Sequence, residues 1–295
     1  MLLLFLFVAV VLAAPSKTVE PRLVGVAITP TPTPLPTDVR RAATLSGYGE
    51  LADRIAQAAR PTMVLNPRRR PRGVGTSRIG GDPDLADGTR WPRCHGRPQS
   101  FLAQIRVSDL PAGASELRRH GGVLLFFTHV EFEPGVTDYG LWAGECSTVL
   151  HARDGERLRR TRAPRGVMML KPAALRFTQR PDVPDTGLDV DHLMPPLQDI
   201  TPPSWEAWFE FRFGLQGRPI LEHRLLGYGS SPNGGNACYE RAERSTLTWR
   251  HLLTIGPDDD RGFGVADAGR LQLFISPADL RAGRFDRVCG VFDSG

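Results

Sequence analysis

Residues that could support catalysis are few in this sequence, and their spacing fits no common enzyme motif. A serine hydrolase needs a nucleophile, a base and an acid that orients the base. Ser230 and Ser231 lie in a loop rich in glycine, proline and asparagine, and His223 and His251 flank this loop. The Gly-x-Ser-x-Gly turn that exposes a hydrolase nucleophile does not occur. We therefore assign no catalytic residue, and the sequence favours a protein that is not an enzyme.

Glycine-rich stretches that could hold a dinucleotide are incomplete. They are Gly73-Val74-Gly75, Gly227-Tyr228-Gly229 and Gly262-Phe263-Gly264. Each begins a dinucleotide fingerprint but lacks its third glycine, and none joins a buried strand to a helix start. Asp189, Asp191 and His192 could hold a hard cation, but acidic loops between prolines are usually only solvated. We predict neither a cofactor nor a bound metal.

Four residues are candidates for binding. Gln104 interrupts an apolar strand, so its amide needs hydrogen-bond partners if that face is buried. It either bonds to a neighbouring loop or lines a cleft between two parts of the domain. Trp91 and Trp249 fit core aromatics better than ligand platforms. His223 joins them as a polar residue close to the glycine-rich loop.

Strands dominate the elements that would position these residues. Apolar side chains alternate through residues 101–107, 209–213 and 271–275, which is the pattern of half-buried strands. Two helices are expected beside them. The first covers residues 47–60 and ends at Pro61. The second begins after Ser276, whose hydroxyl can cap it, and ends at a glycine.

An internal similarity indicates two related halves. The first half contains, in order, Ile79-Gly80-Gly81, Trp91, residues 101–105 and residues 122–127. The second contains Leu226-Gly227-Tyr228, Trp249, residues 251–255 and residues 269–275. The two strand pairs are separated by nearly equal intervals, as expected of a repeated unit. We therefore expect a single strand-rich α+β domain of two related, pseudo-symmetric halves.

The N-terminus has the features of an export signal. Residues 1–14 form an unbroken apolar run, too short to span a membrane but suited to a signal peptide cleaved before Ala14. No basic residue precedes the run, so a misassigned start and a cytoplasmic protein are the alternative. Residues 15–43 contain alternating prolines and are expected to form an extended spacer. The globular domain is assigned to residues 44–295, with no transmembrane helix, and export to the periplasm or cell exterior is favoured.

Positive charge comes almost entirely from arginine. The net charge is +5, and Lys17 and Lys171 are the only lysines. Arginines are dense in residues 68–72 and 157–165, beside proline or glycine and without aromatic residues to stack on bases. Solvated loops account for both runs, and a surface for an anionic partner is the alternative. No nucleic-acid partner is expected.

The four cysteines are widely spaced along the chain. They are Cys94, Cys146, Cys238 and Cys289. None forms a C-x-x-C pair, which argues against a zinc ribbon or a thioredoxin-like site. Four separate thiols and one or two structural disulfides are both compatible with the sequence, and the pairing is not determined.

A series of short motifs resembles the YwqG-like family, a bacterial domain of unknown function. In the first half the motifs are residues 77–83, Trp91-Pro92, residues 101–105 and residues 122–127. In the second half they are residues 223–228, 249–253 and 267–271, Asp279-Leu280 and Arg284-Phe285. The resemblance covers about residues 62–293 and implies an α+β fold and a soluble bacterial protein. Thr254 departs from the usual motif, which puts in doubt a site shared by both halves.

This resemblance supplies no reaction. Some members look associated with bacterial toxin systems, which implies an immunity-type binding role. We therefore expect a non-enzymatic binding protein that recognises another protein through exposed sheet edges or the groove between its halves. The alternative is a hydrolase or small-ligand enzyme that uses a cleft between the halves.

Overall fold

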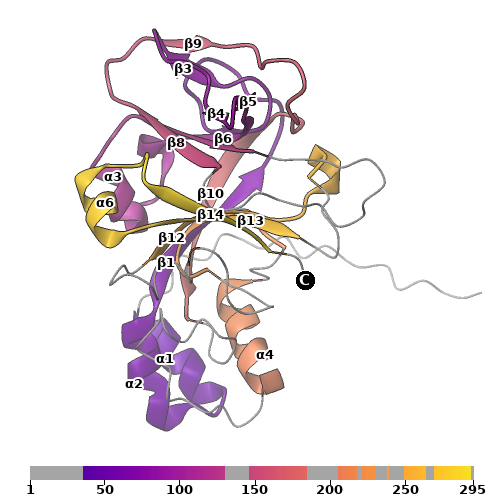
Figure 1. The fold of residues 1–295 in the computed structure, drawn as a ribbon. Helices are drawn as coiled ribbons and strands as arrows, with labels where there is room; N and C mark the ends of the chain where they lie inside the picture. Colours follow the sequence, from indigo (N-terminus) through magenta and orange to yellow (C-terminus); the bar gives the residue numbers. More distant parts are fainter. Residues whose placement is uncertain are drawn as a thin grey trace, which may run out of the picture. The chain divides into compact units, whose positions relative to one another are not determined.

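The residues that the structure describes make up most of the chain beyond the apolar leader. This computed structural model describes residues 36–129, 146–184, 205–217, 221–229, 238, 249–263 and 269–293 (Figure 1). The leader 1–14, most of the spacer, Ser230, Ser231 and the acidic group at 189–192 lie outside them.

One antiparallel sheet forms the centre of the domain. Its order is β14-β13-β12-β11-β1-β10-β2-β6-β7-β8. The strands are β1 (Arg60–Pro67), β2 (Arg78–Ile79), β6 (Ser100–Arg106), β7 (Val123–Thr128), β8 (Ser147–Ala152), β10 (Ala173–Asp182), β11 (Arg224–Leu226), β12 (Arg250–Ile255), β13 (Arg270–Ile275) and β14 (Val288–Asp293). Two short ribbons pair β3 (Asp84–Ala86) with β9 (Leu158–Arg160) and β4 (Arg93–Cys94) with β5 (Arg97–Pro98). The strand-rich α+β class is therefore confirmed.

Helices are short and lie outside the sheet. They are α1 (Pro36–Leu45), α2 (Ala52–Ala58), α3 (Ser115–Arg118), α4 (Trp205–Gln216) and α6 (Pro277–Ala282), with 3-10 turns η1 (Gly49–Leu51), η2 (Val107–Asp109), η3 (Ala112–Ala114) and η6 (Asp259–Arg261). Helices α1, α2 and α4 gather at one end of the domain around their own apolar cluster, in which Tyr48 and Trp208 are buried (Figure 1).

The first helix differs from its expected bounds. The segment 47–60 is divided into η1 and α2, and Gly47 separates it from α1 by adopting a left-handed φ of 88°. Pro61 does not end the helix, because strand β1 has already begun at Arg60. Helix α1 overlaps the segment assigned to the spacer, and Val39 and Ala43 within it are buried.

The strand expected at residues 209–213 is wrong, because these residues belong to helix α4. Their phenylalanines alternate, but helical spacing also gathers apolar residues. Trp208 and Phe211 are buried three residues apart, whereas Phe213 is 38% exposed. A short apolar run fits the period of a strand and the period of a helix, and packing against α1 and α2 favours the helix.

The second helix is confirmed as α6. The Ser276 hydroxyl accepts a hydrogen bond from the Asp279 amide at 3.0 Å, and Pro277 begins the helix. Gly283 ends it with a left-handed φ of 67°. These local signals suffice because capping depends only on neighbouring residues.

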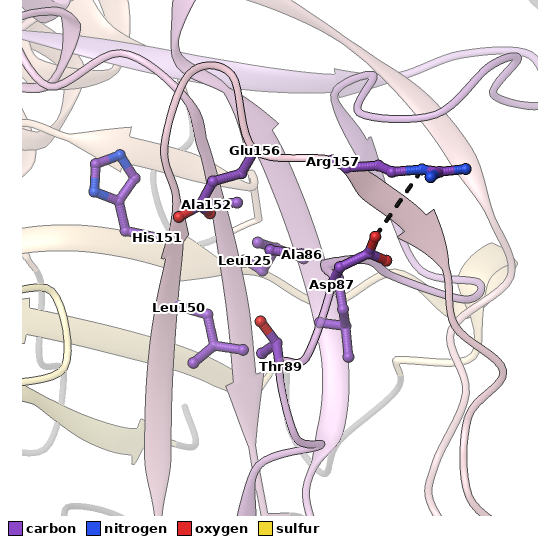
Figure 2. Close-up of a pocket in the computed structure, with 10 residues that line it drawn as sticks. Ala86, Asp87, Thr89, Leu125, Leu150, His151, Ala152, Glu156 and Arg157 are labelled. Atoms are coloured by element: carbon purple, nitrogen blue, oxygen red, sulfur yellow. Dashed lines mark ion pairs between the residues drawn. The ribbon is translucent and has the colours of Figure 1, made fainter.

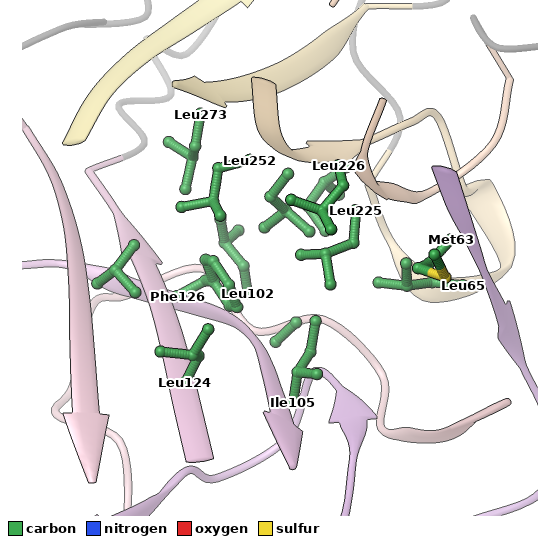
Figure 3. Close-up of a cluster of buried hydrophobic side chains, with 14 of the residues drawn as sticks. Met63, Leu65, Leu102, Ile105, Leu124, Phe126, Leu225, Leu226, Leu252 and Leu273 are labelled. Carbon is green, nitrogen blue, oxygen red and sulfur yellow. The ribbon is translucent and has the colours of Figure 1, made fainter. Parts of the chain in front are cut away.

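The main apolar core joins strands from both ends of the sheet. Leu102, Leu124 and Phe126 from β6 and β7 belong to the same buried cluster as Leu252 and Leu273 from β12 and β13 (Figure 3). All five are essentially inaccessible to solvent. In the described part of the chain, strands from both ends of the sheet therefore share one packed apolar core.

The two edge strands of the sheet lie against each other. Strands β8 and β14 contact one another although they stand at opposite ends of the strand order. Gly290 in β14 faces the Ser147 hydroxyl so closely that a Cβ atom would overlap it. The two described edge strands thus approach each other closely at Gly290 and Ser147.

Both pairs of cysteines form disulfides. Cys94 is bonded to Cys146 and Cys238 to Cys289, with Cα–Cα distances of 5.5 and 5.8 Å. In each pair the later cysteine lies at or beside an edge strand, β8 or β14. Among the described helices, none is long and apolar enough to cross a membrane.

Candidate functional site

Gln104 lies in a buried polar network and has no free hydrogen-bonding group. Its Nε2 donates to the Thr76 carbonyl at 2.9 Å and to Asp84 Oδ2 at 2.8 Å. Its Oε1 accepts from Arg78 Nη2 at 3.0 Å and from the Asp84 amide at 2.9 Å. Since the side chain is fully buried, Gln104 holds the β2–β3 segment against β6.

Asp84 is the charged centre of this network. Arg78 lies 2.9 Å from Oδ2, Arg160 donates to Oδ1 at 2.5 Å, and the Gly75 amide donates to Oδ2 at 2.7 Å. Burial alone raises the pKa of Asp84, but hydrogen bonds from Arg160, Gly75 and Gln104 outweigh it and the pKa lies below its ordinary value. The carboxylate is therefore ionised and fully engaged. Sequence analysis missed this pair, although Arg78 and Asp84 stand inside or beside the motif 77–83.

Trp91 is a half-buried aromatic residue packed against the strands beside this network. Its indole N–H donates to the Gln99 carbonyl at 2.8 Å, and its ring meets Phe127 edge-on with centroids 5.5 Å apart. It packs on a cluster that includes Leu85 and Leu125. Trp91 thus supports neighbouring strands and presents no free polar group.

His223 is bonded on both ring nitrogens. Nδ1 accepts from the Gly256 amide at 3.1 Å, so Nε2 carries the proton and donates to Asp258 at 3.0 Å. Burial raises the pKa of Asp258, but the bonds from His223 and the Arg261 amide bring it below its ordinary value. In a serine hydrolase one imidazole nitrogen must face the nucleophile. Here both nitrogens bond to the fold itself.

Trp249 lies in a different cluster, against Cys238, Phe274 and Cys289. Its buried indole N–H has no hydrogen-bond partner among the residues that the structure describes. Among the described residues, no hydrogen bond, ring contact or shared cluster joins His223 or Trp249 to Gln104 or Trp91. The four candidates do not form one site.

A pocket of about 310 Å³ lies between the β3–β9 ribbon and the β7–β8 pair (Figure 2). Its apolar lining consists of Leu85, Ala86, Leu125, Leu150 and Ala152. Its polar lining consists of Asp87, Thr89, His151, Glu156 and Arg157. Leu85 and Leu125 are buried, Leu150 and His151 are half-buried, and the other polar lining residues are exposed. An apolar floor with a few polar groups is typical of small-ligand sites.

Several charged or polar side chains at this pocket already have partners within the fold. Asp87 lies 3.2 Å from Arg159 and 4.0 Å from Arg157. Glu156 accepts from the Arg153 amide at 3.1 Å, and His151 Nε2 lies 3.1 Å from the Gly121 carbonyl. Among the lining residues no hydroxyl is hydrogen-bonded to a base, which is the pairing that activates a serine or threonine nucleophile.

Sequence analysis missed the pocket because no motif marks it. Its residues come from β3, β7, β8 and two turns, which only the folded sheet brings together. A second group, Cys94, His95 and Cys146, has ligand atoms within 4.8 Å of one another. The two sulfurs of this group form a disulfide and are not free to bind a metal.

Comparison with known proteins gives a family but no activity. No curated protein matches the chain. A family model described as a domain of unknown function (DUF1963) matches residues 77–293, which contain Arg78, Asp84 and Gln104, the pocket and both disulfides. This match spans most of the chain, and the protein therefore belongs to the DUF1963 family.

Proposed function

We propose that the protein is a non-enzymatic binding protein whose ligand site is the pocket between the β3–β9 ribbon and the β7–β8 pair. The observation that carries this proposal is the combination of an apolar floor with an exposed charged rim. Polar residues that could have served catalysis, such as Gln104 and His223, are bonded within the fold. The ligand class that fits is a compact apolar group of about the pocket volume.

Pocket binding can be tested with N-phenyl-1-naphthylamine, a neutral apolar fluorescent probe. We expect saturable binding to the full chain. Leu150→Trp should weaken binding more than tenfold, because the larger side chain fills a pocket about the size of a small ligand. Leu45→Trp is the matched control, since Leu45 is 78% exposed and outside the pocket. Equal probe binding by both variants would show that the pocket is not the binding site.

The same variants separate binding from the hydrolase alternative. Turnover of p-nitrophenyl butyrate by the wild-type chain that Leu150→Trp abolishes would make the pocket an active site and overturn the non-enzymatic proposal. The immunity-type role and the YwqG-like label rest on the sequence resemblance alone. A toxin protein that forms a stable complex with the wild-type chain is the result that would support that role, and the absence of a complex with neighbouring-gene products would contradict it.

We also propose that the protein is exported. The signal-like leader and the bonding of all four cysteines support this compartment, because disulfides persist in oxidising environments. The intact mass of the protein, measured under non-reducing conditions, tests leader cleavage and disulfide formation together. A mature chain that starts at Ala14 and contains no free thiol is expected. A chain that starts at Met1 with four thiols would contradict export.

Finally, we propose that the two halves arose by duplication. The strand order supports it, because four strands flank the central β1–β10 pair on each side. Strand β6 has a bulge between Phe101 and Ala103, and β12 has one between His251 and Leu253. Arg78 pairs with Gln104 in register, and Arg224 pairs with Thr254.

This register shifts the expected alignment by one residue. Leu226 is now aligned with Gly80 instead of Ile79. Both Gly80 and Leu226 have left-handed φ angles, of 64° and 61°. Both arginines are buried and face a buried aspartate, Asp84 or Asp182. An experimental structure in which the two four-stranded groups superpose without bringing the bulges together would contradict the duplication.

A further inference from the structure

Two arginine-rich segments that are far apart in the chain meet in space. The loop after β1 contains Arg68, Arg69, Arg70 and Arg72, and the segment through β9 contains Arg157, Arg159, Arg160, Arg162 and Arg165. Arg160 joins them, since its Nη2 donates to the Gly73 carbonyl at 2.8 Å while its Nε binds the buried Asp84. Leu158 Cδ1 also lies 3.1 Å from where a Gly75 Cβ would stand. The two segments therefore lie side by side.

Most of these arginines carry charge that no acid neutralises. We call the exposed side chains of Arg68, Arg69, Arg70, Arg72, Arg157, Arg159, Arg162 and Arg165 the arginine surface. Arg157 and Arg159 share Asp87, and the other six form no ion pair with the described residues. Asp82 accepts from the Ala163 amide and Asp109 from the Ser77 hydroxyl, and within the described residues neither carboxylate forms an ion pair with these arginines. The surface thus has a strong excess of positive charge.

Arginine forks are suited to phosphate groups, and two observations select the kind of phosphate. Neither segment contains an aromatic residue that could stack on a nucleic-acid base. Val74 projects 49% exposed from the middle of the loop, between Gly73 and Gly75 with φ angles of 82° and 72°. A nucleic-acid backbone offers this apolar side chain nothing, whereas a bilayer interface accommodates it beside its headgroups.

We propose that the arginine surface docks the protein on a bilayer of anionic phospholipid, with Val74 entering the interface. Each arginine near such a surface strengthens binding about fivefold. This attraction is electrostatic and weakens as salt screens it. The proposal goes beyond the pocket and does not require a ligand there.

Sedimentation with vesicles tests the docking on the full chain. Vesicles of phosphatidylglycerol and phosphatidylcholine should bind the wild type at low salt, and vesicles of phosphatidylcholine alone should not. Arg68→Gln/Arg70→Gln/Arg72→Gln should weaken binding about 100-fold. Arg159→Gln/Arg162→Gln/Arg165→Gln should have a similar effect, because both segments belong to one surface.

A matched control removes the same charge elsewhere. Arg41→Gln/Arg119→Gln/Arg281→Gln changes three exposed arginines outside the surface and should leave binding within a few-fold of wild type. If this control loses as much vesicle binding as the other two triple variants, net charge alone explains the binding and the proposal is overturned. A loss of binding in the variant of only one of the two segments would also overturn it.

Val74→Ser separates a membrane from a nucleic acid. It should weaken vesicle binding several-fold, since the apolar contact is lost, and leave the unfolding midpoint unchanged because the side chain is exposed. Wild-type vesicle affinity in Val74→Ser, or tighter binding of a DNA duplex than of the anionic vesicles, would overturn the membrane assignment.

Discussion

Buried polar side chains in this protein bond to the chain itself, and His251 is the clearest case. Its Nδ1 donates to the Leu226 carbonyl at 2.9 Å, and its Nε2 accepts from the Thr254 hydroxyl at 2.6 Å. The ring is 3% exposed. Burial lowers the pKa of His251 from 6.5 to about 4, because the charged form would lose its hydration. The imidazole is thus held neutral.

This histidine makes stability depend on pH. Because its pKa is lower in the folded chain, the unfolded chain binds more protons between pH 6.5 and about 4. The contribution of His251 is complete above pH 6.5 and is lost as pH falls through this window, by about 3 kcal/mol in all. Urea unfolding at pH 7 and pH 4.5 should show most of this loss.

His251→Phe isolates the effect, since phenylalanine stands at the register-matched position 101. The variant should be less stable than wild type at pH 7, because the Leu226 carbonyl loses its donor. Its stability should then fall less than that of the wild type between pH 7 and 4.5. Parallel pH profiles for the two proteins would contradict a buried neutral His251.

The polar candidates show what sequence can predict at the residue scale. An amide inside an apolar strand indicated that Gln104 must be hydrogen-bonded, and the structure provides four hydrogen bonds to three residues. The identity of those partners could not be predicted, because Arg78 and Asp84 reach Gln104 only after β2 pairs with β6. His223 likewise meets Asp258 only across a loop. The sequence therefore predicted that single polar residues need hydrogen bonds, but not which residues provide them.

At the scale of elements, the turn that follows β2 depends on glycine. Gly80 has a φ of 64°, and a Cβ atom there would overlap the Leu170 backbone. Gly88, in the turn after β3, has a φ of 81° but no atom within 4 Å of its Cβ position. Both glycines therefore have a left-handed conformation, but only Gly80 is in close contact with another part of the chain.

Replacing each glycine by alanine separates backbone strain from overlap. Gly88→Ala should cost about 1 kcal/mol, because only the left-handed conformation is strained. Gly80→Ala should cost about 3 kcal/mol or more, since the Leu170 backbone must also move. Chemical denaturation measures both changes. Equal costs would show that the β2 turn does not pack against Leu170 as described.

Local signals predicted some elements and failed for others. The caps of α6 lie within a few residues of one another, so Ser276 and Gly283 were sufficient to place that helix. The segment 209–213 has a period that fits a strand, and only its packing with Tyr48 makes it helical. Position 226 shows the same limit, since nothing in a leucine side chain predicts the left-handed φ of 61° that this residue adopts.

For the whole molecule, the disulfides tie the outer parts of the sheet to distant segments. Cys94–Cys146 closes a loop with a sequence separation of 52, and Cys238–Cys289 closes one with a separation of 51. The sequence contained the four cysteines but not their pairing, because the folded sheet alone brings β4 to the start of β8. Loops of nearly equal length restrict the unfolded chain to nearly the same extent.

The two bridges should therefore contribute similarly to stability. In the loop-entropy description each contributes about 4 kcal/mol, a large share of the total for a domain of marginal stability. Cys94→Ser/Cys146→Ser and Cys238→Ser/Cys289→Ser should lower the free energy of unfolding in urea by comparable amounts. A reductant should destabilise the wild type at least as much as either variant, and should hardly change the variant that lacks both bridges. A wild-type chain whose unfolding is insensitive to reductant would show that its stability does not depend on these crosslinks, and would remove the physical reason to place its folding in an oxidising compartment.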